Sequence, residues 1–536
     1  MSGLWKNKYE KTEESRMKYP IGVQNFAAII EQGYAYADKT DLVYKLAQQH
    51  VCFLSRPRRF GKSLLISTLD AYFKGKKEFF RGLKIEEYEK EWIEYPVFRI
   101  DFALGDYSTP NTLDDILVDY LEKWEEKFEI KNVRETLGVR FKNVIEKASE
   151  KTGRRVVILI DEYDKPMLDA LGTEQEEKNR NTLRGFYGTF KAADEHLRFV
   201  LLTGVTKFSQ VSVFSGFNQP DDISMDSRYD AICGITEEEL YSYFSESIEE
   251  MAEKMEYTVD EMKEVLKKQY DGYHFSKNLK LDIYNPFSLI NAFNKMEIEN
   301  YWYRSGTPAY LAKLLEGHNV NMQKLTGRGY ESQYFVDYRA DSEDPLAMLY
   351  QSGYLTIKGY DKTYNEYMLD YPNNEVRKGF MTLTANSYFG KTEDSPDNWI
   401  KNVDRMLHRC DLDGVRDAFT SFLSSIPYEA NKDERAKDFE THFSYTFYII
   451  NRLLGCYTTL IEKQNSKGRA DIVIETDRDV FIFEFKLDGS AEEALKQIEE
   501  KQYAVPYLDD KRTVHKIGVN ISSKSRTVDE WIVEEG

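Results

Sequence analysis

The chain has few cysteines, and their positions exclude two common uses of this residue. Its 536 residues contain 4 cysteines, at Cys52, Cys233, Cys410 and Cys456. They lie far apart, without zinc-ligand spacing and without the disulfide framework of a small secreted protein. Three of them have apolar neighbours, and we expect these to be buried as small hydrophobic side chains. The reducing cytoplasm is therefore the predicted location.

Long apolar runs, internal repeats and low-complexity tracts are also absent from the sequence. No run approaches the length of a bilayer span, and residues 1–18 are polar and charged, so we expect neither a membrane helix nor a signal peptide. A net charge of −19 argues against a broad surface that coats nucleic acid, although it permits a local basic groove. With 41% hydrophobic and 14% aromatic residues, the chain is predicted to be folded rather than disordered.

A phosphate-binding loop is predicted where a short buried strand, residues 51–54, gives way to an amphipathic helix. The junction carries Gly61, Lys62 and Ser63. A glycine lets the backbone approach phosphates, a lysine reaches the β and γ oxygens, and a serine hydroxyl can bind Mg²⁺ at a helix N-terminus. The first glycine position of this motif is occupied by Arg56, so the motif is incomplete.

An acidic pair follows a second apolar strand about a hundred residues later. Residues 156–160 are typical of a central parallel strand that is buried on both faces, and Asp161 and Glu162 come directly after it. Ligands of open α/β sheets bind at this carboxyl edge. We therefore predict that Asp161 holds Mg²⁺ through water and that Glu162 orients or deprotonates the attacking water.

Further strands and a helix complete an expected alternation of strand and helix. The hydrophobic pattern predicts strands at residues 97–102 and 199–206 and a long amphipathic helix at residues 114–127. Polar residues at the end of the latter strand are candidates for sensing a γ-phosphate, with an ordinary strand end as the alternative for each. These candidates are Thr203, Thr206 and Lys207.

The C-terminal part of the sequence carries a second predicted site. In an extended strand Glu484 and Lys486 project from one face, and Asp471 on the preceding hairpin strand can reach the same face. Carboxylate oxygens beside a lysine suit a Mg²⁺ site that hydrolyses a phosphodiester with metal-activated water. Glu440 is a candidate further metal ligand, and Gln497 is a candidate to face the site from a following helix.

These motifs together resemble a bacterial architecture of two parts. The segments Tyr19–Gly22, Tyr36–Thr40, Ser55–Ser63 and Ile160–Asp164 are similar to the AAA-ATPase-like domain, including its arginine-rich loop. The segments Gly468–Asp471 and Glu484–Lys486 resemble the PD-(D/E)xK nuclease superfamily, with alanine in place of proline before the aspartate.

The resemblance implies an α/β protein in which a P-loop NTPase with a parallel sheet is fused to a restriction-endonuclease-like α/β domain. It implies that Gly61, Lys62, Ser63 and Asp161 bind nucleotide and Mg²⁺, and that Glu162 serves hydrolysis. It assigns nuclease chemistry to Asp471, Glu484 and Lys486. No arginine finger is evident in the sequence.

Four regions are expected along the chain. They are an AAA-ATPase-like domain over 1–235, a helical lid or winged-helix-like region over 236–330, an α/β connecting region over 331–425, and a nuclease-like domain over 426–536.

The leading functional hypothesis is an ATPase whose nucleotide state regulates a Mg²⁺-dependent nuclease. Its cofactors would be ATP and Mg²⁺, and its partner would be nucleic acid, with DNA favoured, bound at the C-terminal domain. A homo-oligomer is compatible with the sequence, and no membrane partner is expected. Two alternatives stay open: an ATP-dependent switch that binds DNA or protein without cutting it, and a small-molecule kinase.

Overall fold

The structure is a computed structural model of the whole chain. It describes residues 17–131, 135–207, 220–305, 325–326, 328–336, 344–389, 396–425, 459–460, 464–465, 468–469, 472–508, 510–525 and 527–535. The described residues form two compact units, which we call unit 1, ending at Glu375, and unit 2, beginning at Val376. Within these ranges, no helix combines the length and the apolar character that crossing a membrane requires.

Unit 1 contains a parallel sheet in which the described strands pair in the order β2-β3-β4-β1-β5. The strands are β1 (Val51–Ser55), β2 (Val97–Asp101), β3 (Val156–Asp161), β4 (Leu197–Gly204) and β5 (Asp221–Asp222). Every residue of β3 is buried, as expected for an apolar run in the centre of a parallel sheet. The register aligns Ser55 of β1 with Gly204 of β4, so the carboxyl ends of these strands meet at one edge.

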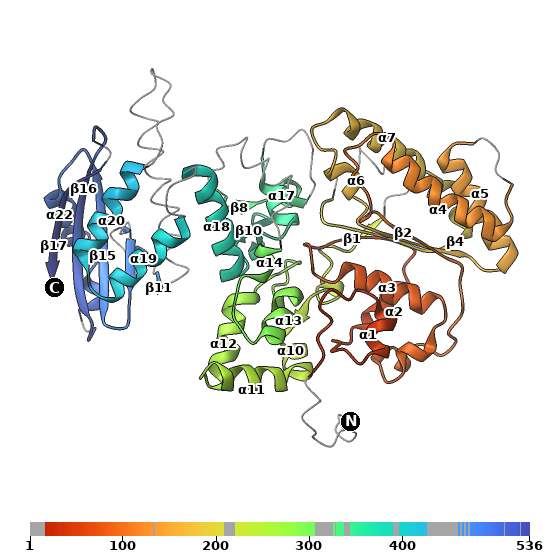
Figure 1. Cartoon of the computed structure of the whole chain (residues 1–536), viewed down its shortest axis with the longest axis horizontal. Helices are drawn as coiled ribbons and strands as arrows, with labels where there is room; N and C mark the ends of the chain where they lie inside the picture. Colours follow the sequence, from red (N-terminus) through yellow and green to blue (C-terminus); the bar gives the residue numbers. More distant parts are fainter. Residues whose placement is uncertain are drawn as a thin grey trace. The chain divides into compact units, whose positions relative to one another are not determined.

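Helices cover both faces of this sheet, which confirms the predicted α/β fold (Figure 1). One face carries α1 (Phe26–Glu31), α2 (Thr40–Ala47) and α3 (Lys62–Phe73), and the other carries α4 (Thr112–Phe128), α5 (Leu137–Thr152) and α7 (Glu174–Tyr187). The two shorter helices of this part are α6 (Lys165–Leu168) and α8 (Thr189–Ala192). Because β4 separates β1 from β3, the phosphate-loop strand and the acidic strand are next-but-one neighbours.

The middle of the chain is helical, as predicted. Its helices are α10 (Glu237–Tyr243), α11 (Ser245–Lys254), α12 (Val259–Tyr270), α13 (Pro286–Lys295) and α14 (Tyr301–Arg304), with the short strands β6 (Ile235–Thr236) and β7 (Ile283–Tyr284). Capping boxes at Thr236 and Thr258 begin α10 and α12. Leu240, Met262 and Leu289 are fully buried in the core that these helices share.

A small antiparallel sheet ends unit 1. Its strands pair in the order β8-β10-β9, with bounds β8 (Gly329–Tyr330), β9 (Thr356–Asp361) and β10 (Glu366–Asp370). Two helices accompany it, α16 (Gln333–Val336) and α17 (Leu346–Gln351).

Unit 2 contains a mixed sheet with the described strands in the order β11-β14-β15-β16-β17. The elements are α18 (Asn374–Phe389, which begins at the end of unit 1), α19 (Pro396–His408), α20 (Leu412–Ser425), β11 (Thr459–Leu460), β12 (Gln464–Asn465), β13 (Gly468–Arg469), β14 (Ile472–Glu475), β15 (Asp479–Leu487), α22 (Ala491–Glu500), β16 (Thr513–Ser522) and β17 (Thr527–Glu535). Strands β15 and β16 run parallel, and α22 makes the crossover between them. Leu495 and Ile498 of α22 pack against Val480 and Ile482 of β15.

One residue, Trp302, joins the phosphate loop to the last residue of unit 1. The indole N–H of Trp302 donates to the carbonyl of Arg58 at 3.0 Å, and the Trp302 backbone N–H donates to Glu375 Oε1 at 2.7 Å. Ser288 donates to the other oxygen of Glu375 at 2.6 Å. Glu375 lies in the first turn of α18, which continues into unit 2. We call the series Arg58–Trp302–Glu375 the Trp302 link.

The carboxyl of Glu375 predicts a pH dependence of stability. Burial raises its pKa to about 7. A raised carboxyl pKa means that the folded state holds the proton more tightly, so this contribution to stability is complete below the unfolded pKa and is lost as the pH rises towards 7. Glu375→Gln should therefore raise the free energy of unfolding of unit 1 at pH 8 by about 1–3 kcal/mol and change it little at pH 4.5.

Denaturation midpoints of the full chain at the two pH values measure this effect. The exposed Glu331 supplies the matched control, because Glu331→Gln should leave the midpoints unchanged at both pH values. An unchanged midpoint at pH 8 for Glu375→Gln would show that the ionised carboxylate of Glu375 does not destabilise unit 1.

Candidate functional site

The predicted phosphate loop lies at the carboxyl edge of the parallel sheet, between the end of β1 and the start of α3. Gly61 has a φ of 96°, a left-handed conformation that favours glycine, and a Cβ at this position would meet no atom within 4 Å. No side chain caps the first N–H groups of α3, which begins at Lys62. Open space and uncapped N–H groups at a helix start are suited to an anion.

The carbonyl groups of this loop are turned towards donors within unit 1. The Nζ of Lys62 donates to the carbonyls of Arg56 and Pro57. The indole N–H of Trp302 donates to the carbonyl of Arg58, and the backbone N–H of Gly234 donates to that of Phe60. All four distances are 3.0–3.3 Å. A backbone whose carbonyls are satisfied on one side can present N–H groups on the other. The loop is therefore held in the orientation that phosphate binding needs.

Arg56 fixes the base of the loop from inside the protein. Its guanidinium donates to the carbonyls of Ser55, Ser224 and Tyr229 at 2.8–3.1 Å and lies 3.9 Å from the ring centroid of Phe275. The side chain is 1% exposed, and burial lowers its pKa. The residue at the first glycine position of the motif is thus a structural cross-link, and the structure gives it no exposed face for phosphate.

The acidic pair at the end of β3 lies beside the loop lysine. Glu162 Oε1 is 3.7 Å from Lys62 Nζ. Burial raises the pKa of Glu162, and the Lys62 ammonium opposes that rise. Glu162 also has a φ of 53°, a strained conformation of the kind that occurs at functional sites. The structure therefore brings the predicted base and the predicted phosphate-binding lysine together.

Asp161 has one carboxylate oxygen available for a ligand. The residue is 1% exposed, and its Oδ1 accepts a hydrogen bond from Thr203 Oγ1 at 2.7 Å. Its Oδ2 is buried and receives no hydrogen bond from the described residues. A buried carboxylate oxygen that is left over in this way suits the hydration shell of Mg²⁺. Ser63, the second residue of α3, follows Lys62 directly and can contribute its hydroxyl to the same ion.

The three candidate sensors have different partners. Thr203 contacts Asp161, as described above, whereas Thr206 donates its hydroxyl to Asp164 at 2.7 Å. The ammonium of Lys207 pairs with Asp222 at 2.9 Å. Of these residues Thr203 therefore has the position that best fits a role next to the acidic pair.

In unit 2, three side chains of the predicted nuclease site form a chain of contacts. Glu484 is 2% exposed and accepts a hydrogen bond from the amide of Gln497, whose oxygen in turn accepts one from the ammonium of Lys486. Lys486 Nζ is 3.7 Å from Glu484 Oε1. Gln497 on α22 thus holds the carboxylate and the ammonium of β15 at a fixed separation.

Two predicted members of this site, Asp471 and Glu440, lie outside the described residues. Of the described members, Glu484 offers carboxylate oxygens, and no thiol or imidazole belongs to the cluster of Glu484, Lys486 and Gln497. Hard oxygen donors of this kind fit Mg²⁺ better than a thiophilic metal. The cluster is therefore compatible with the metal that the sequence predicts.

The Trp302 link was not predicted from the sequence. Trp302 is separated from Arg58 by 244 positions, and no motif surrounds it. The one sequence feature that could have drawn attention to Trp302 is its place in an aromatic segment at the start of α14. Gln497 was anticipated as a residue that faces the nuclease site, but its role as a bridge requires the orientation of α22 on the sheet.

Comparisons with known proteins agree with this geometry. Residues 20–214 match the family described as "Predicted AAA-ATPase", and residues 438–531 match the family described as "PD-(D/E)XK nuclease superfamily". A protein of Azotobacter chroococcum mcd 1, named as an uncharacterized protein in the vnfD 5′ region, is 34% identical over 528 residues. The match covers 97% of this chain and 99% of that protein.

The parallel sheet with its phosphate loop therefore places unit 1 among AAA-ATPase-like proteins. With the second match, the chain belongs to the family of AAA-ATPase-like proteins that carry a C-terminal domain of the PD-(D/E)XK nuclease superfamily.

A substitution of Arg56 separates a structural role from a phosphate-binding role. Arg56→Met should lower the free energy of unfolding of unit 1 by about 2–4 kcal/mol, because three carbonyls would lose their donor in a buried site. Arg59→Met is the control, since Arg59 is exposed and stacks on Phe287 at 4.2 Å, and it should cost less than about 1 kcal/mol. Denaturation without nucleotide measures both. A stable Arg56→Met protein that binds ATP poorly would instead make Arg56 a phosphate ligand.

Proposed function

We propose that the chain binds and hydrolyses ATP with Mg²⁺, and that its nucleotide state controls a Mg²⁺-dependent nuclease in unit 2. The observation that carries the proposal is the Trp302 link, because it joins the phosphate loop directly to the first turn of the helix that leads into unit 2. The AAA-ATPase match supports ATP hydrolysis in unit 1, and the nuclease-superfamily match supports phosphodiester cleavage in unit 2. The Trp302 link connects the loop to α18.

The nucleotide site would use five groups of this chain. The N–H groups at the start of α3 and the ammonium of Lys62 would bind the phosphates, and Ser63 with Asp161 would hold Mg²⁺. Bound Mg²⁺ would supply charge neutralisation at the phosphate oxygens. Glu162, beside Lys62, would orient and deprotonate the attacking water, and its raised pKa brings its proton affinity closer to neutral pH.

Nucleotide binding would disturb the loop through Lys62. In the structure its ammonium donates to the carbonyls of Arg56 and Pro57. Phosphate oxygens would compete for these same donors, and the loop carbonyls would then need other partners or another orientation. The neighbouring carbonyl of Arg58 is the one that holds Trp302. A change in the contacts of Lys62 would therefore pass along the loop backbone to Arg58. From there it would reach Glu375 through the two hydrogen bonds of the Trp302 link.

The nuclease site would use Glu484, with Asp471, as carboxylate ligands of Mg²⁺, which would supply an activated water. Lys486 would stabilise the developing charge on the phosphate, and Gln497 would keep the ammonium in place. The substrate would be nucleic acid, with DNA favoured. The cytoplasmic location and the homo-oligomer stay predictions.

Two variants test the ATPase. Lys62→Ala should weaken ATP binding about 10–100-fold, because a charged donor to the phosphates is lost. Glu162→Gln should bind ATP as the parent does and hydrolyse it about 10²–10⁴-fold more slowly, because an amide cannot accept the proton. Equilibrium binding of ATP and phosphate release measure the two effects.

Lys74→Ala is the matched control for the ATPase, since Lys74 follows the same helix α3 and pairs with Asp70 away from the loop. It should leave both ATP binding and hydrolysis unchanged. Full hydrolysis by the Glu162→Gln protein would remove Glu162 from the mechanism.

Three variants test the nuclease. Asp471→Ala and Glu484→Ala should abolish cleavage of DNA and lower the affinity for Mg²⁺, because each removes a carboxylate from the ion. Lys486→Ala should slow cleavage about 10²–10³-fold while it leaves Mg²⁺ affinity in place, since an ammonium stabilises charge and binds no cation. Plasmid cleavage over a series of Mg²⁺ concentrations measures rate and affinity together.

Glu500→Ala and Lys496→Ala are the controls for the nuclease, because these residues form an exposed ion pair on α22. Both proteins should cut like the parent. If the parent cuts neither DNA nor RNA in any nucleotide state, the nuclease proposal fails and a switch that binds without cutting takes its place.

A further inference from the structure

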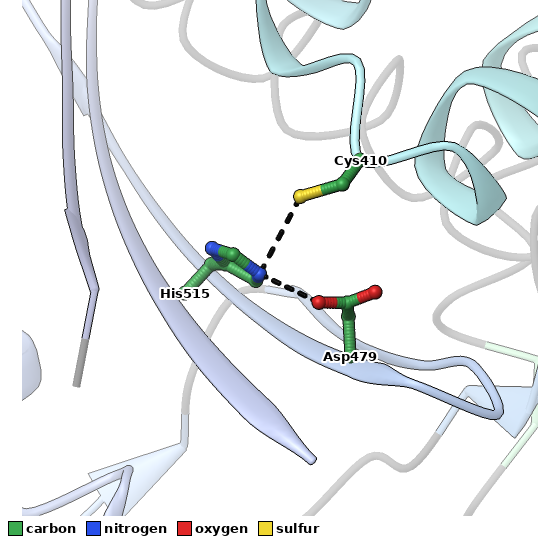
Figure 2. Close-up of side chains that lie close together, drawn as sticks. All are labelled: Cys410, Asp479 and His515. Atoms are coloured by element: carbon green, nitrogen blue, oxygen red, sulfur yellow. Dashed lines mark hydrogen bonds and ion pairs between the residues drawn. The ribbon is translucent and has the colours of Figure 1, made fainter.

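Three side chains of unit 2 that come from different elements bring a sulfur, a nitrogen and an oxygen together. Cys410 Sγ is 3.5 Å from His515 Nε2, and His515 Nε2 is 2.9 Å from Asp479 Oδ1 (Figure 2). The three ligand atoms all lie within 4.8 Å of one another. Cys410 follows α19, Asp479 begins β15 and His515 lies on β16. We call these residues the Cys410 cluster.

We propose that the Cys410 cluster is a binding site for Zn²⁺, distinct from the magnesium site of the nuclease. A thiolate, an imidazole and a carboxylate are the ligand types that zinc takes in proteins, whereas Mg²⁺ takes oxygen ligands. Tetrahedral zinc with ordinary bond lengths separates a sulfur from a nitrogen ligand by about 3.5 Å. The Cys410 thiolate and the Asp479 carboxylate would together neutralise the ion.

The direction of the imidazole favours a metal over a nucleophilic triad. In a Cys–His–Asp triad the thiol and the carboxylate bind to different ring nitrogens. Here both Cys410 and Asp479 face the same nitrogen, Nε2. The other nitrogen, Nδ1, is buried and has no hydrogen-bond partner among the described residues, since Glu535 Oε1 lies 4.0 Å away, beyond hydrogen-bond distance.

Packing and hydrogen bonds hold two of the three residues in place. His515 is 2% exposed, and its ring stacks on Phe481 with a centroid distance of 4.9 Å. Asp479 closes the turn from β14, with its backbone N–H donating to Thr476 Oγ1 at 3.0 Å. Such preorganisation is expected of a site that is built for a ligand.

Cys410 occupies the left-handed position that commonly ends a helix, where its N–H donates to the Leu407 carbonyl at 3.0 Å and the Asp411 N–H donates to the Met406 carbonyl at 2.9 Å. It follows the C-terminus of α19 with a φ of 55°, a left-handed conformation in which glycine is the usual residue. A cysteine in place of the usual glycine puts a thiol at the end of the helix. The conformation directs the thiol towards His515 (Figure 2).

The Cys410 cluster is separate from the nuclease residues. Asp479 and Glu484 are five positions apart on β15, so their side chains project from opposite faces of the sheet, about 17 Å apart along the strand. The zinc would join the turn between α19 and α20 to the ends of β15 and β16. It would therefore stabilise the packing of these helices on the sheet, and an exposed Cys410 would leave the fourth position to water.

The test uses the full chain carrying Glu484→Ala, in a reducing buffer with excess Mg²⁺, so that the nuclease site does not take up zinc. Titration with ZnCl₂ should give one tight site per chain and should raise the Tm of unit 2. Cys410→Ser and Asp479→Asn should each weaken the site at least about 10-fold. His408→Asn is the control, because exposed His408 lies two residues before Cys410 and bonds to the Asp404 carbonyl; it should bind like the parent.

Cobalt supplies a readout that does not depend on the folding of any variant. Co²⁺ added to the parent chain should give a thiolate-to-cobalt charge-transfer absorption band, which Zn²⁺ should displace. Absence of this band, or zinc affinity equal in the parent and Cys410→Ser proteins, would overturn the proposal. Loss of nuclease activity has no bearing on it, because the measurements report the metal alone.

Discussion

The orientation of the phosphate loop depends on hydrogen bonds to its carbonyl groups, and the rest of unit 1 is arranged around that requirement. A loop can offer N–H groups to an anion only when its carbonyls have partners elsewhere. Lys62 supplies two of these partners from within the motif, and Trp302 and Gly234 supply the others from the segment that follows the sheet. Arg56 fixes the base of the same loop through its buried guanidinium. The helical middle region thus helps to orient the predicted phosphate loop.

The energies of the hydrogen bonds in the Trp302 link indicate how strongly nucleotide binding could influence a second site. A hydrogen bond of this kind contributes on the order of 1 kcal/mol, and coupling between sites typically amounts to about 1–3 kcal/mol, or roughly 5–150-fold in an equilibrium. Rearrangement of the two bonds of the Trp302 link would therefore be enough to produce the proposed difference in nuclease activity between nucleotide states. No large movement of the sheet is needed, because Glu375 already lies in the first turn of the helix that leaves unit 1.

Features with a local pattern were predictable from the sequence, and features made by distant residues were not. The apolar run ending in Asp161 and Glu162 specified a buried strand with acids at its edge, and the alternation around Glu484 specified which face carries the charge. Trp302 and the Cys410 cluster carry no such pattern, since their partners are 73 to 244 positions away in Trp302 and 36 to 105 in His515. The inward turn of Arg56 depends equally on carbonyls at 224 and 229.

We propose that nucleotide state reaches the nuclease through the Trp302 link. The most direct measurement compares the rate of DNA cleavage by the full chain without nucleotide, with ADP, and with ATP held by the Glu162→Gln variant. We expect rates that differ by at least about 5-fold between states. We also expect that Trp302→Phe, which removes the indole N–H, still binds ATP, because the other three loop carbonyls keep their donors, and that it abolishes the difference at saturating ATP. Equal cleavage in all three states, or an undiminished difference in Trp302→Phe, would contradict it.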